Sequence, residues 1–175
     1  MPSPILVPDT GPLITLAYAG QLDLLQRPGW PVHVVDMVLH EATRNQTPTS
    51  EAIAAFVRER KVEVLPTTVW SRYWERLTQA EVAGTAPPRK AGLGELAIQE
   101  YMNRLALDRP AVPAVFLFED HKIARASFHL PENARRVSTR AFLLFLEENG
   151  WIESAADIER RAIQNGRNFS QLRFP

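Results

Sequence analysis

The sequence contains no cysteine among its 175 residues. This absence excludes disulfide bonds, thiolate zinc sites and cysteine nucleophiles. The chain also lacks an apolar run of the roughly 18 residues that a membrane-spanning helix needs, so no such helix is predicted. The N-terminal segment MPSPILVPDTG has neither the basic residues nor the long apolar stretch of a secretory signal, which predicts a cytoplasmic protein.

The chain has no excess of either charge. Its 20 lysines and arginines balance 20 aspartates and glutamates, for a formal net charge of +0 at pH 7. Proteins that coat duplex nucleic acid without sequence preference usually carry a basic excess, so this role is disfavoured. A neutral total is compatible with local patches of either sign. The length suits one domain, and a hydrophobic content of 45% is enough to form a core.

Short apolar runs alternate with helical patterns along the chain. The expected strands are residues 5–7, 32–35, 62–65 and 114–118, with a short edge strand near Val137. Strands that alternate with helices are typical of a parallel sheet covered on both faces. The sequence therefore predicts an α/β protein, a three-layer α/β/α sandwich with about four to five parallel strands, as a single domain over residues 1–175.

Two regions depart from this alternation. Residues 66–91 hold Trp70, Tyr73 and Trp74, followed by glycine and prolines. They predict an insertion with one short helix and an exposed loop, whose aromatic residues fit either a core role or a partner-binding surface. Residues 139–175 predict C-terminal helices followed by a polar, basic tail.

Four acidic residues fall where a parallel sheet would bring them together. Asp9 and Asp120 follow apolar strands, whereas Glu41 and Glu95 lie near the starts of helices. In open parallel sheets, ligands bind outside the carboxyl ends of the strands. Right-handed crossovers place helix starts at that same edge. The four carboxylates are therefore expected to converge there.

Clustered carboxylates repel one another unless a cation compensates their charge. Oxygen ligands suit Mg²⁺ or Mn²⁺, which can activate water and stabilise charge on a phosphoryl group. Each acid taken alone also has a structural explanation, as a turn former, a helix cap or a favourable charge at a helix N-terminus. The combination of all four favours a divalent-metal site that cuts phosphodiesters.

The segments around these acids resemble the PIN-domain family of metal-dependent nucleases. They are Ile5–Ala17, Val38–Ala42, Gly92–Ala97 and Phe118–Arg125, and their order and spacing match the family across nearly the whole chain. The resemblance implies a three-layer fold and an endoribonuclease that depends on Mg²⁺ or Mn²⁺. Many members are VapC-type toxins, so it also implies an RNA substrate, an antitoxin partner and a homodimer.

The resemblance assigns catalytic and metal-binding roles to Asp9, Glu41, Glu95 and Asp120. It places Thr10 and Thr139 where small hydroxyl residues help to hold metal or substrate. The basic residues expected to guide RNA are Arg44, Lys122, Arg125, Arg135, Arg136 and Arg140.

Two positions depart from the family pattern. Gly11 stands where relatives often have serine, and Leu93 where a close branch often has an extra glutamate. Glu119 adjoins an expected ligand, but alternation along a strand predicts that its side chain points to the other face. A second function remains open, in which the domain keeps the fold and acts as a catalytically silent scaffold for protein or RNA.

Overall fold

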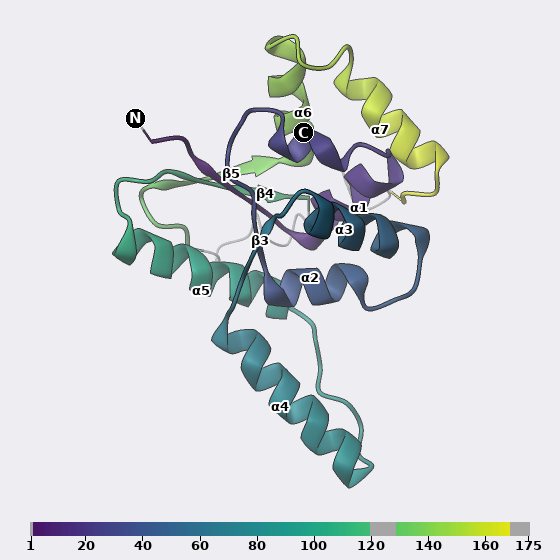
Figure 1. Cartoon of the computed structure of the whole chain (residues 1–175), viewed down its shortest axis with the longest axis vertical. Helices are drawn as coiled ribbons and strands as arrows, with labels where there is room; N and C mark the ends of the chain where they lie inside the picture. Colours follow the sequence, from purple (N-terminus) through teal and green to yellow (C-terminus); the bar gives the residue numbers. More distant parts are fainter. Residues whose placement is uncertain (1, 120–128, 169–175) are drawn as a thin grey trace.

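The computed structural model describes residues 2–119 and 129–168, and within them the chain alternates between strands and helices (Figure 1). The strands are β1 (Ile5–Pro8), β2 (His33–Val35), β3 (Glu63–Leu65), β4 (Ala114–Phe118) and β5 (Ala134–Ser138). The helices are α1 (Thr10–Tyr18), the 3₁₀ helix η1 (Leu22–Gln26), α2 (Asp36–Thr43), α3 (Pro48–Glu59), α4 (Thr68–Ala83), α5 (Leu93–Asp108), α6 (Thr139–Glu148) and α7 (Ala155–Gln164). None of these helices is long and apolar enough to cross a membrane.

All strand pairs are parallel. β4 lies between β1 and β5 in one sheet, and β2 pairs with β3 in another. An isolated parallel bridge between Leu6 and Val32 joins the two sheets, together with a 2.8 Å hydrogen bond from Leu6 N to Pro31 O. The strands therefore follow the order β3-β2-β1-β4-β5, which confirms the predicted parallel sheet.

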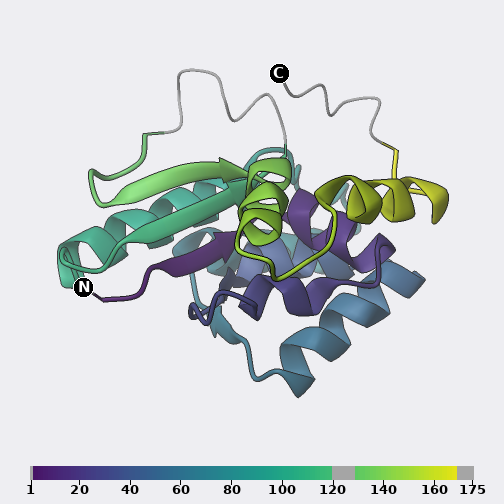
Figure 2. The same cartoon turned by 90° about the horizontal axis from the view of Figure 1, so that it is seen from above.

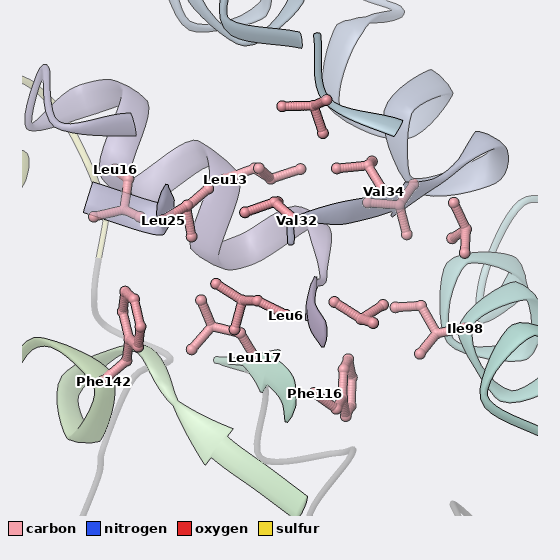
Figure 3. Packing of buried hydrophobic residues seen from close by; sticks show 14 of the residues in the cluster. Leu6, Leu13, Leu16, Leu25, Val32, Val34, Ile98, Phe116, Leu117 and Phe142 are labelled. Carbon is pink, nitrogen blue, oxygen red and sulfur yellow. The ribbon is translucent and has the colours of Figure 1, made fainter. Parts of the chain in front are cut away.

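Helices cover both faces of the sheet, which explains why β1 and β4 are apolar in sequence. Leu6 and Leu117 lie on the face covered by α1 and α6, near Leu13 and Phe142, whereas Phe116 lies on the side of Ile98 from α5 (Figure 3). α7 contacts both α1 and α6, and these helices lie side by side in Figure 2. The result is the predicted three-layer α/β/α arrangement.

The strand order reverses next to β1, because the chain passes from β1 to β2 and β3 on one side and reaches β4 on the other. Such a switch point, at the carboxyl ends of the strands, is where open α/β sheets bind ligands. β1 and β4 end at the same level, since Asp9 N donates a 2.9 Å hydrogen bond to Leu117 O. The residues that follow these strands thus lie at the edge where chemistry is expected.

Residues 66–91 differ from the prediction of a short helix, because α4 contains 16 residues and projects from the body of the protein (Figure 1). No glycine or proline interrupts it before Gly84, whose left-handed backbone (φ 64°) ends the helix. Its start is held by two carboxylates. Asp36 on α2 accepts hydrogen bonds from Thr67, and Glu100 on α5 accepts them from Thr68.

Candidate active site

Asp9 connects β1 to α1 and is 8% exposed. It is the N-cap of α1, and its Oδ1 accepts a hydrogen bond of 2.8 Å from the backbone N of Thr10. A carboxylate at this position is stabilised by the positive end of the helix dipole. The predicted first acid is therefore held in place at the carboxyl edge of the sheet.

Glu41 lies beside Asp9's helix, because its Oε2 accepts a hydrogen bond of 3.2 Å from Thr10 Oγ1. The Glu41 carboxylate also contacts the first turn of α5, where Gly94 lies. A Cβ atom at Gly94 would lie only 2.7 Å from Glu41 Oε2, closer than side chains tolerate. Glycine at position 94 therefore allows α5 to approach the carboxylate. Thr10, one of the predicted supporting hydroxyl residues, has the expected place.

Burial raises the pKa of Glu41, and the neighbouring Glu95 carboxylate raises it further. Hydrogen bonds from Thr10 and from the Gly94 backbone, and the positive charge of Arg44, act in the opposite direction without cancelling the increase. Two of the predicted acids, Glu41 and Glu95, thus lie close enough to repel one another. A positive charge between them would relieve that repulsion.

The oxygen donors at this edge fit Mg²⁺ or Mn²⁺ better than a soft metal. Within residues 2–119 and 129–168, however, no group of three or more acidic or histidine side chains is placed to hold a metal ion. The fourth predicted acid, Asp120, lies outside the described residues.

The other predicted site residues fall into different settings. Thr139 begins α6 and is 3% exposed, and its hydroxyl has no hydrogen-bond partner in the described part of the chain. Arg44 is near enough to Glu41 to influence its pKa. Arg140 instead faces α7, where its Nε lies 3.9 Å from Glu159 Oε1. Lys122 and Arg125 lie outside the described residues.

A family model described as PIN domain (DUF3368) matches residues 5–104. The chain belongs to the PIN-domain family. Among solved structures it is similar to the PIN domain of RRP44 from T. brucei, with a TM-score of 0.48 and 15% sequence identity over 85% of this chain and 84% of that one. No curated protein matches the sequence.

The segment matched by the PIN-domain model contains three of the four predicted acids. The matched residues, 5–104, include Asp9, Glu41 and Glu95. These are the three predicted acids whose surroundings the structure describes. The protein therefore has a nuclease-type fold, with these carboxylates at the carboxyl edge of its sheet.

Glu119 in this PIN domain has a structural partner that the sequence did not reveal. It is 3% exposed, and its Oε2 accepts hydrogen bonds from Thr15 Oγ1 at 2.8 Å and from Arg167 Nη2 at 2.9 Å. A Cβ at Gly11 would lie 3.1 Å from the Cβ and from Oε2 of Glu119, so a side chain at position 11 would crowd this carboxylate. Glu119 thus anchors the residues after α7 to the end of β4.

His40 directly precedes Glu41, and the sequence alone assigned it no role near the acids. Its ring lies 4.6 Å from Trp70 and 5.7 Å from Tyr73, both on α4. Burial lowers the pKa of His40, and the positive charges of Lys90 and Arg44 lower it further. A neutral imidazole therefore links α4 to the helix that carries Glu41.

Replacement of Gly94 by alanine is expected to reduce any cleavage activity of this PIN domain by about 10-fold, the order of effect seen when groups that position metal ligands are lost. The added Cβ displaces the Glu41 carboxylate. The fold should remain intact, because alanine favours a helix more than glycine does. Cleavage rates and urea unfolding of the two proteins would check this. If the free energy of unfolding falls together with the cleavage rate, the substitution causes a general packing defect instead.

Proposed function

We propose that this PIN domain is a metal-dependent endoribonuclease that hydrolyses RNA phosphodiester bonds. The observation that carries the proposal is the half-buried Glu41, with a raised pKa, beside Glu95 at the same sheet edge as Asp9. A structural protein gains nothing from two adjacent carboxylates that repel one another. A nuclease gains a place for a divalent cation.

In this proposal Mg²⁺ or Mn²⁺ is held by Asp9, Glu41, Glu95 and the predicted fourth acid, Asp120. A cation bound there would supply positive charge to the scissile phosphate. The protein's own groups orient the ligands. Thr10 donates a hydrogen bond to Glu41, and the backbone of Gly94 does the same. The start of α1 holds the Asp9 carboxylate in place. Water is the nucleophile, so no covalent intermediate is required.

The test is cleavage of a mixed pool of single-stranded and structured RNA in Mn²⁺, in Mg²⁺ and in chelator. Asp9→Asn is the decisive variant, because asparagine still caps a helix while one negative charge is lost. Asp23→Asn is the matched control, since Asp23 is exposed and pairs with Arg60 on elements that carry none of the acids, η1 and the end of α3. Products that require metal and disappear only in Asp9→Asn would support the proposal. Identical behaviour of all three proteins would favour a silent scaffold.

The proposal extends to the setting common in the family, a cytoplasmic toxin that an antitoxin protein holds in check, with the PIN domain as a homodimer. The support is the family membership of residues 5–104. Expression of the native chain should then arrest growth, and Asp9→Asn should relieve the arrest. Growth unaffected by an active enzyme would point to RNA processing instead.

A further inference from the structure

A pocket lies between α4, the segment that follows it, and the start of α5. We call it the α4 groove. Its apolar floor includes Val69, Leu93 and Leu96, and its rim carries three arginines, Arg72, Arg76 and Arg89. The lining residues from α4 belong to the N-terminal part of this helix, which projects from the body of the protein in Figure 1. Of the predicted RNA contacts that the structure describes, Arg44, Arg135, Arg136 and Arg140, none lines this groove.

The rim is positively charged, and no carboxylate among residues 2–119 and 129–168 pairs with its arginines. Arg72 and Arg76 lie on the same face of α4 as Val69 and Tyr73, because these positions are spaced by three and four residues. Arg72, Arg76 and Arg89 form no hydrogen bond or ion pair with any other described residue. Exposed arginines with free forks are suited to phosphate groups.

The floor of the groove is apolar but not buried by the protein itself. Leu96 remains 54% exposed although it lies next to the arginine rim. An apolar floor bordered by cations matches a nucleotide, whose base has a flat apolar face and whose phosphate is anionic. Single-strand binding proteins combine a basic track with aromatic surfaces for bases, and the α4 groove combines a basic rim with an aliphatic floor beside Tyr73.

The groove borders the first turn of α5, which also carries Glu95. Leu93 and Leu96 line the groove from one face of this helix, and Glu95 lies between them in sequence on the adjacent side of the same turn. A fourth cation, Lys90, has its Nζ 5.8 Å above the centre of the Tyr73 ring, which lines the groove. The charge of Lys90 also contributes to the lowered pKa of His40, the neighbour of Glu41. Positive charge therefore extends from the α4 groove towards His40.

We propose that the α4 groove holds a single-stranded segment of the RNA substrate, with a base on its apolar floor and phosphates on its three arginines. This inference rests on the proposed nuclease function and adds the place where substrate is held. An acidic peptide also complements the rim. The apolar floor favours RNA, because it suits the flat face of a base and lies within one helical turn of Glu95 on α5.

The experiment measures binding of a fluorescein-labelled single-stranded RNA in chelator, where no metal-dependent cleavage takes place. The test variant is Arg72→Gln with Arg76→Gln, and the control is Arg27→Gln with Arg58→Gln on other elements. We expect about 10-fold weaker binding for the test variant only, with a salt-dependence slope lower by about 1.4, or roughly 0.7 per phosphate contact. Equal binding by both double variants would overturn the proposal.

A second variant, Leu96→Ser, tests the apolar floor with little risk to folding, because Leu96 is already half exposed. It should weaken binding of the RNA but not of an abasic strand of equal length. Equal loss for both strands would contradict base binding. Arginine-dependent binding of polyglutamate without binding of RNA would replace the proposal by an acidic protein partner. Because binding is measured without metal, these results are independent of whether Asp9→Asn abolishes cleavage.

Discussion

Replacing Glu41 by glutamine is expected to lower RNA cleavage by about 100-fold, the order of effect that loss of one electrostatic group has in an active site. The same change should make the metal-free protein more stable at neutral pH. Both effects have one cause. The Glu41 carboxylate is partly desolvated beside Glu95, a cost that Thr10, the Gly94 backbone and Arg44 offset only in part.

The sign of the stability change follows from the raised pKa of Glu41. A carboxyl whose folded pKa is raised above 4.5 favours folding at low pH, and that contribution is lost as the pH rises through the folded pKa. The advantage of Glu41→Gln should therefore be present at pH 7 and shrink on acidification towards pH 4.5. Urea unfolding in chelator at several pH values would measure it.

The matched control is Glu148→Gln, at the exposed end of α6. It should change neither cleavage nor the pH dependence of unfolding. Full activity of Glu41→Gln would show that Glu41 is not part of the active site. Lower stability of that variant at neutral pH in chelator would show instead that the carboxylate is a structural hydrogen-bond acceptor.

Replacing Arg167 by methionine is expected to destabilise the fold by about 3 kcal/mol, because removal of one partner leaves a buried charge uncompensated. The partner is Glu119, which is 3% exposed and 2.9 Å from Arg167 Nη2. Urea unfolding would measure the loss. Arg161→Met, on the exposed side of α7, should have little effect.

A second substitution separates charge from packing at this ion pair. Glu119→Gln in the Arg167→Met background should recover part of the lost stability, because it removes the unpaired carboxylate while keeping its shape. If the double variant is no more stable than Arg167→Met, the loss comes from the packing of the arginine stem and not from its charge.

Local patterns in the sequence were sufficient to predict the sheet and the closeness of two of the candidate acids, whose role in a site stays a prediction. The apolar run before Asp9 predicts β1, and parallel topology alone brings helix starts to the strand ends. The structure places Glu41 and Glu95 close together as expected. Asp120 remains a prediction, because it lies outside the described residues.

Pairings between distant residues were beyond the reach of local patterns. Glu119 and Arg167 are 48 positions apart, and no periodicity connects them. The α4 groove likewise combines Val69 with Leu96, which meet only because α4 packs against α5. The length of α4 was underestimated because its aromatic residues suggested an irregular insertion, whereas a capped start and an uninterrupted run to Gly84 favour a long helix.

The way α4 is attached has a consequence for how such proteins diverge. Asp36 and Glu100 hold only its first residues, through hydrogen bonds to Thr67 and Thr68. The outer turns contribute little to the core, and Val82 near the tip is 85% exposed. Substitutions can therefore accumulate on the outward surface of α4 without disturbing Asp36 and Glu100, the carboxylates that hold its start. Two descendants of one ancestor could keep the same chemistry and differ in what they recognise.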